Sequence, residues 1–216
     1  MLTQSQIRSI PRELAQIMLG FEDALMIFYV LGDQEKAEAL VTEMSRHIDR
    51  ESLNTIVRTI EQTKRNDDKI YSRMNLKPTD VSRETIAANA QKLSNTLKQS
   101  VYFSYARLDW TQPGFKGYGE ELRQSLKVFA AQGITTVTSG ARNYSIEAYT
   151  RMSVTGGAIQ ASAQASMERA RSVGVDKVII SKHMGARPDH AAWQGKVFTM
   201  EELHTVCGYG TITGIC

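Results

Sequence analysis

Side chains that can take part in catalysis or metal binding concentrate near the C-terminus, in the stretch KVIISKHMGARPDHAAWQGKVF at residues 177–198. They comprise two imidazoles, a guanidinium, a carboxylate, an indole, an amide and an amine, on His183, Arg187, Asp189, His190, Trp193, Gln194 and Lys196. These side chains come just after the strand-like apolar run that begins the stretch, and they lie among Gly185, Pro188 and Gly195. Three interpretations are open: a metal site, an active site, or a loop whose polar groups brace one another.

A metal site would draw on the histidines and cysteines of this region, which are His183, His190, His204, Cys207 and Cys216. Structural zinc sites usually take ligands in tight pairs two to four residues apart, because one turn then presents both to the ion. His204 and Cys207 form one such pair, whereas the two earlier histidines are separated by seven positions and Cys216 stands alone. We therefore expect no bound metal, and no other cofactor is indicated.

Catalysis by this region has two candidate forms. Cys207 would act as a nucleophile with a nearby histidine as base, but nothing in its sequence surroundings marks it as an activated thiol. Asp189 and His190 would act as an acid–base pair. Adjacent residues on an extended segment point to opposite sides, however, so they serve one site only within a turn. We favour Asp189 as the N-cap of a short helix and expect no enzyme activity.

The third interpretation explains most of the stretch without a reaction. Arg187 can brace a loop through bidentate hydrogen bonds, and Trp193 can anchor it through its rings. Gly195 then turns the chain into a short strand at residues 196–199. Farther on, GYGTITG at residues 208–214 lacks the adjacent lysine–hydroxyl pair of a phosphate-binding P-loop.

Upstream, the first hundred residues predict helices. Apolar residues recur at three- and four-residue spacing after Pro11, and the pattern breaks at Gly32. Asp33 is expected to cap a second helix, Asp49 a third that ends before Pro78, and Asp80 or Ser82 a fourth that reaches residue 105. The glycine-rich stretch 109–119 is expected to be a loop and a domain boundary.

Beyond that boundary the pattern changes to helix, glycine, strand. A helix closed by Gly133 precedes a strand at 134–138, and a helix capped by Ser145 and closed by Gly174 precedes a strand at 175–181. The two strands are expected to pair, with helices over one face. The predicted fold class is α+β, with a helical docking region at 1–110 and a domain of helices packed on a small sheet at 111–216.

Composition excludes several classes of protein. The 216 residues are 42% hydrophobic and 23% charged, with a net charge of +3, which is far from the basic stripe of a dedicated DNA-binding protein. Two cysteines are too few for a disulfide framework. The most apolar stretch, residues 24–31, is short of the ~20 residues that cross a bilayer. With no signal peptide visible, we expect no association with a membrane.

The motif as a whole resembles a known family. HMGARPDHAAWQGKVF followed by GYGTITGIC is similar to the C-terminal signature of the phage minor capsid protein 2 family, which is related to the Mu F-like head morphogenesis proteins. The resemblance covers residues 119–216. The matching signature includes His183, Gly185, Arg187, Pro188, His190, Trp193, Gln194, Gly195, Gly208 and Gly210. In the family this segment runs on to a further cysteine, an arginine and a histidine, so a site that needed them would be incomplete here.

The resemblance implies a virion component. Such a minor head protein would be associated with the portal and the inner capsid or scaffold, and would act in head assembly, DNA packaging or DNA delivery. It would lie in the phage head, and in the bacterial cytoplasm during assembly. Contact with packaged double-stranded DNA would be independent of sequence. An enzyme or toxin-like effector carried in the head and using residues 183–196 is the alternative.

Overall fold

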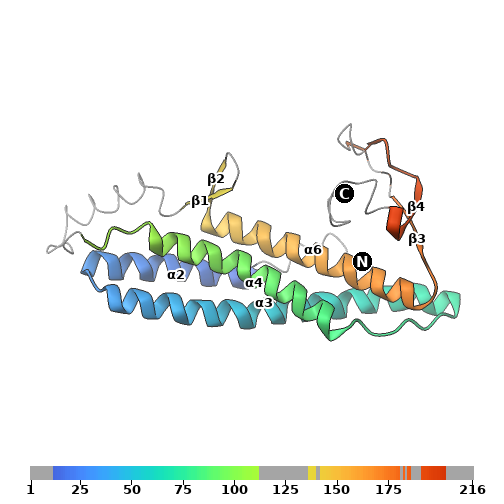
Figure 1. Ribbon diagram of the computed structural model, residues 1–216, viewed down its shortest axis with the longest axis horizontal. Helices are drawn as coiled ribbons and strands as arrows, with labels where there is room; N and C mark the ends of the chain where they lie inside the picture. The colour runs from blue at the N-terminus through green and yellow to red at the C-terminus, as the bar shows by residue number, and fades with distance from the viewer. Residues whose placement is uncertain are drawn as a thin grey trace. The chain divides into compact units, whose positions relative to one another are not determined.

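A computed structural model describes residues 12–111, 136–139, 142–180, 182, 184–185 and 191–202 (Figure 1). Its elements, in chain order, are α2 (Arg12–Leu31), α3 (Gln34–Tyr71), a 3₁₀ turn (Ser72–Met74), α4 (Arg83–Ala106), β1 (Thr136–Ser139), β2 (Arg142–Ser145), α6 (Ile146–Ser172), β3 (Lys177–Ile179) and β4 (Val197–Thr199). Long helices with two small antiparallel hairpins confirm the predicted α+β class.

The break between the first two helices is where the sequence predicts it. Gly32 adopts a φ of 68°, a left-handed conformation that glycine adopts without a steric penalty. Its amide donates to the carbonyl of Tyr29, and the amide of Asp33 donates to that of Phe28, which satisfies the last carbonyls of α2. Asp33 then accepts a hydrogen bond from the amide of Lys36 at 3.1 Å and so caps α3.

The prediction of separate second and third helices is wrong, because α3 continues unbroken through 38 residues. No glycine or proline lies within it, so nothing forces an interruption. Asp49, the predicted cap, instead contacts α4: it accepts hydrogen bonds from Ser94 and, at 2.8 Å, from Lys98. A residue with good capping chemistry therefore serves here to join two helices.

The predicted start of α4 is confirmed, and of the two candidate caps, Asp80 and Ser82, it is Ser82 that caps the helix. The hydroxyl of Ser82 accepts a hydrogen bond from the amide of Thr85 at 3.2 Å, as an N-cap does. The end of the preceding helix differs from expectation. It stops at Tyr71, well before Pro78, and Asn75 takes up the left-handed conformation with a φ of 55°.

The predicted pairing between the two strands of the C-terminal half is wrong. The strand at 136–139 pairs with β2, and β3 pairs with β4, giving two separate two-stranded sheets in the described part of the chain. Each strand thus finds its partner locally, through a hairpin. Local pairing costs less loop-closure entropy than pairing across the long helix α6.

Packing divides the described chain into two compact units. Unit 1 contains residues 56–89 and 158–202, and unit 2 contains residues 12–55 and 90–157. Helices α3, α4 and α6 each contribute to both units. The prediction of a docking region at 1–110 and a family domain at 111–216 concerns function, and it stays a prediction.

Unit 2 has a core of large apolar side chains. Its residues at most 9% exposed include Leu14, Met18, Phe21, Leu25, Val41, Met44, Ile48, Leu93, Leu97, Val101, Leu108, Ile146 and Val154. Hydrogen bonds between side chains also join α3 to α4. Tyr105 donates to Glu38 at 2.7 Å, and the hydroxyls of Ser45 and Tyr102 lie 3.4 Å apart, so α3 and α4 lie side by side.

Helix α2 also qualifies by length and composition as a membrane-spanning segment, over residues 13–31. The sequence-based expectation that no apolar stretch is long enough to cross a bilayer considered only the uninterrupted run at residues 24–31. It does not hold for the helix as a whole. The core helix of a soluble protein and a signal sequence near the N-terminus both pass the same test. Here Met18, Phe21 and Leu25 of α2 are buried in unit 2, whereas Ile27 and Leu31 are exposed.

Glu22 is a destabilising group in the core of unit 2. Its Oε1 atom is buried and has no hydrogen-bond partner among the described residues. Burial, and secondarily the charge of Asp23, raises the pKa of Glu22 from 4.5 to about 8. The folded chain therefore binds a proton that the unfolded chain releases, and stability falls as the pH rises from about 4.5 to about 8.

We expect the Glu22→Gln variant to be more stable than the parent at pH 8.5, because glutamine carries no charge that must be buried. The gain should be limited to about 1–2 kcal/mol, since water reaches part of the side chain. At pH 5 the two should unfold alike. Urea unfolding at both pH values measures this, with Glu43→Gln on the exposed side of α3 as the control. Equal stabilities of the parent and Glu22→Gln at pH 8.5 would show that the carboxylate is solvated.

Candidate functional site: the hairpin that follows α6

The candidate site lies in residues 177–199, here called the signature hairpin, and α6 positions its start. The helix is capped by Ser145, whose hydroxyl accepts from the amide of Ala148 at 3.2 Å, as predicted. It closes at Gly174, whose φ of 77° lets the amides of Gly174 and Val175 bond back to Arg171 and Ala170. This tight stop directs the chain into β3 within three residues.

Strands β3 and β4 pair antiparallel, with Val178 opposite Phe198 and Ile179 opposite Val197. The ladder continues past the strands, because the amide of Ile180 donates to Lys196 at 3.0 Å and that of Gly195 returns to Ile180 at 2.8 Å. Side chains alternate between the two faces of a hairpin. Val178, Ile180 and Phe198 are accordingly partly buried, whereas Ile179 and Val197 are exposed.

The far end of the hairpin is anchored by its return to α6. Met200 is 5% exposed; its amide donates to the carbonyl of Asp176 at 2.9 Å, and its sulfur lies 3.1 Å from Nε of Arg171. Thr199 and Glu202 form a reciprocal capping box. The amide of Thr199 donates to the Glu202 carboxylate at 2.7 Å, and the amide of Glu202 donates to the Thr199 hydroxyl at 3.1 Å. These bonds lower the pKa of Glu202.

Trp193 and Gln194 lie where the loop rejoins the hairpin. The Trp193 ring is partly buried in the same apolar cluster as Val178, Ile180 and Phe198. Its carbonyl accepts from the amide of Lys196 at 3.2 Å, which tightens the turn before β4. The packing is of the kind expected for an indole that anchors the loop.

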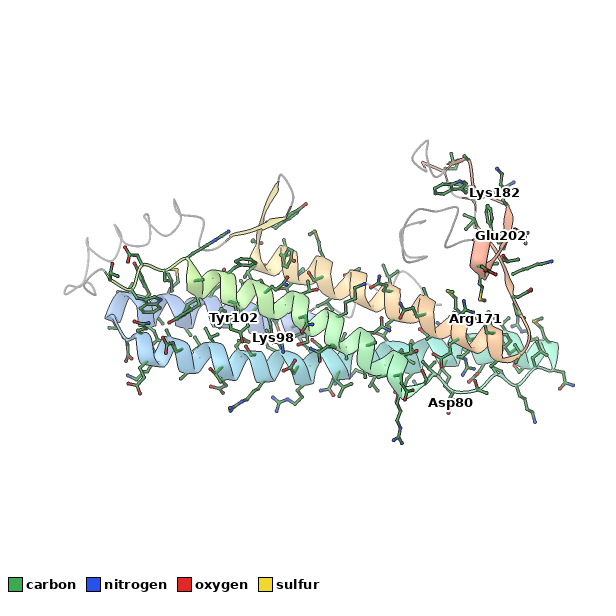
Figure 2. All side chains as sticks on the ribbon, viewed as in Figure 1. Asp80, Lys98, Tyr102, Arg171, Lys182 and Glu202 are labelled. Atoms are coloured by element: carbon green, nitrogen blue, oxygen red, sulfur yellow. The ribbon has the colours of Figure 1, made fainter. Side chains whose placement is uncertain are left out.

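Lys182 is a contributor that sequence reasoning missed. Its side chain crosses directly over Gly195, so a Cβ atom built at Gly195 would lie 2.2 Å from Cε of Lys182. Gly195 also has a φ of 75°, which side-chain-bearing residues rarely adopt. Figure 2 shows Lys182 and Glu202 on this part of the chain. The signal in the sequence was Gly195 itself, but only coordinates show which side chain lies over it.

Replacing Gly195 with alanine is expected to destabilise the signature hairpin by about 1–2 kcal/mol, because the left-handed backbone is strained for any residue with a Cβ. The flexible lysine can move aside, so the backbone term dominates. Gly185→Ala is the matched control. Its φ is 83° but its Cβ would meet nothing within 4 Å, so it should show the backbone cost alone. Thermal unfolding measures the drop in melting temperature of each variant relative to the parent. An unchanged melting temperature for Gly195→Ala would refute the prediction.

In unit 1 the helix that carries the hairpin is held by polar contacts. Arg169 is 1% exposed and donates to Asp68 and, at 3.3 Å, to the carbonyl of Thr79. Asp80 lies 3.9 Å from the same guanidinium and also pairs with Lys64, whose hydrogen bond lowers the pKa of Asp80. The end of α6 is thereby joined to the end of α3 and to the segment that leads into α4.

The structure brings together Trp193, Gln194 and Gly195 of the predicted signature and places Gly185 in the preceding loop. Most of the other predicted residues lie outside the described part of the chain: His183, Arg187, Pro188, Asp189, His190, His204, Cys207, Gly208, Gly210 and Cys216. Among the residues that are described, no three histidine, cysteine, aspartate or glutamate side chains group as metal ligands would. The metal, catalytic and bracing interpretations of residues 183–190 therefore stay predictions.

Comparison with known proteins gives one result. Residues 108–211 match the model of a family described as phage minor capsid protein 2. The match contains α6, the signature hairpin and most of the stretch from which the resemblance was drawn. No curated protein and no solved structure matches this chain.

Proposed function

We propose, from the premise that residues 108–211 belong to the phage minor capsid protein 2 family, that this chain is a minor head protein bound at the portal or inner capsid wall. A structural role in the phage capsid follows from the family itself, and the virion is the corresponding location. Attachment to the portal and a part in DNA packaging or delivery are the finer elements of the proposal. The family match is the observation that carries it.

Two features of the structure support a structural role. The helices of unit 2 bury a core of large apolar side chains, and close packing of this kind suits a protein that must hold its shape in an assembly. The signature hairpin keeps apolar side chains exposed on its outer face, with Ile179 67% and Val197 59% accessible. Exposed apolar residues that neighbour each other across a hairpin are typical of a surface that contacts another protein.

The charge of the hairpin supports an additional contact with packaged DNA. Lys177, Lys182 and Lys196 are all exposed, and residues 111–216 hold 11 basic and 8 acidic side chains. Lysines neutralise phosphates without reading sequence, and salt weakens such binding because it opposes counterion release. We propose that this contact is auxiliary and that protein partners determine the location of the chain.

The proposal is tested by infection with a phage whose gene for this chain carries a stop codon. DNA replication and synthesis of the major capsid protein should proceed, while the yield of infectious particles falls and is restored by the gene supplied in trans. Capture of the portal protein from such lysates by the tagged chain tests the finer element. A normal yield of infectious particles in the absence of the chain would contradict the proposal.

A further inference from the structure

The side chains that α6 buries differ between the two units, although unit 1 also buries Ile56 and Ile60 of α3. Unit 2 buries large apolar side chains, whereas the buried apolar residues that α6 supplies to unit 1 are all alanines: Ala158, Ala161, Ala163, Ala165 and Ala170. Burial stabilises in proportion to the apolar area removed from water, and alanine contributes little area. Unit 1 therefore gains much less from the hydrophobic effect along α6 than unit 2 does.

Polar contacts take the place of the missing apolar ones. Each of the following hydrogen bonds joins α6 to another segment of unit 1: Ser162 to Thr63 at 2.8 Å, Gln164 to Asn89 at 2.7 Å, Ser166 to Asp67 at 2.8 Å, Glu168 to the amide of Ser82 at 2.7 Å and Ser172 to the amide of Thr79 at 2.9 Å. Arg169 adds its bonds to Asp68 and Thr79. Water can replace such partners when the helix detaches, so an intact bond adds little net stability, whereas removing one partner while the other stays buried costs more.

Gly156 marks the point at which α6 passes from one kind of core to the other. The units divide between Gly157 and Ala158. Gly157 has a packing reason, because its Cβ would lie 3.4 Å from the side chain of Leu93. Gly156 has none: a Cβ there would meet nothing within 4 Å, and its φ is not positive. Glycine without such a reason weakens the interior of a helix relative to alanine.

From these observations we infer that residues 158–172 of α6 form a releasable latch, which detaches from its partners in unit 1 while unit 2 stays folded, with Gly156 as the joint. The signature hairpin begins five residues after the latch ends, and Met200 ties it to Arg171 at the latch. Opening therefore removes the support of the hairpin and frees it to rearrange on a partner. Local opening of this kind occurs where buried apolar contacts are few.

Hydrogen exchange of the full chain, followed by mass spectrometry, tests the latch. Amides of residues 158–166 should exchange at least about tenfold faster than those of 150–155, although both lie inside one helix and away from its ends. Asp68→Asn, which removes a partner of Arg169, should accelerate exchange in 158–172 and leave 150–155 unchanged. Equal exchange in the two segments, or an equal response to Asp68→Asn, would overturn the inference.

The joint is tested separately with Gly156→Ala, which should fold because the added methyl group meets no other atom. It should reduce the difference in exchange between 158–166 and 150–155. Gly20→Ala is the matched control, since Gly20 is also an exposed helical glycine with nothing within 4 Å of its Cβ, but lies in α2. An unchanged difference in Gly156→Ala, or the same reduction in Gly20→Ala, would overturn the assignment of the joint.

Discussion

Replacing Asp68 with asparagine is expected to lower the free energy of unfolding of unit 1 by about 2–3 kcal/mol. The guanidinium of Arg169 is 1% exposed, and the Asp68 carboxylate is its nearest counter-charge. Asparagine keeps the size of the side chain but leaves the buried cation without that charge. The expected loss is smaller than the ~3–5 kcal/mol typical of a fully buried pair, because the carboxylate itself is half exposed.

Asp80→Asn provides the control for this prediction. Its carboxylate lies 3.9 Å from Arg169 and is 75% exposed, so removing its charge should leave stability nearly unchanged. Urea unfolding followed by circular dichroism measures both variants under the same conditions. Equal losses for Asp68→Asn and Asp80→Asn would mean that the buried arginine does not depend on one particular partner.

Replacing Phe21 with alanine is expected to lower the free energy of unfolding of unit 2 by about 3–4 kcal/mol, because the change removes a buried ring and leaves a cavity. Phe21 lies at the centre of the buried face of α2 and is 1% exposed. Its neighbours cannot collapse into the space without moving whole helices. Thermal and urea unfolding of the purified chain both measure the loss.

Phe103→Ala removes the same ring from a position 61% exposed on α4, and should change stability by no more than about 0.5 kcal/mol. The pair separates burial from the general effect of losing an aromatic side chain. A loss for Phe103→Ala as large as that for Phe21→Ala would place the core of unit 2 elsewhere.

Helix existence and termini could be read from the sequence wherever one residue type determines the local backbone. Gly32 and Gly174 each take the left-handed conformation that ends a helix, and Ser82 and Ser145 cap the starts of α4 and α6. These signals are local, so they do not depend on the rest of the fold. The family resemblance could also be recognised from the sequence, and the match of the family model over residues 108–211 confirms it.

What could not be read depends on contacts between distant segments. Asp49 has the chemistry of a helix cap, and only the position of α4 beside it shows that it bonds Ser94 and Lys98 instead. Strand pairing likewise follows from loop-closure costs that a strand pattern does not record. Gly195 was singled out by type, yet the lysine lying over it, thirteen positions earlier, was not.

The central claim, that the chain is a component of the phage head, is tested most directly by mass spectrometry of particles purified through a density gradient. We expect peptides from both the N-terminal helices and the signature hairpin to be found with the mature particles, in a constant ratio to the portal protein. Absence of these peptides from mature particles and from assembly intermediates alike, with the chain recovered only in the soluble fraction of the lysate, would contradict the account.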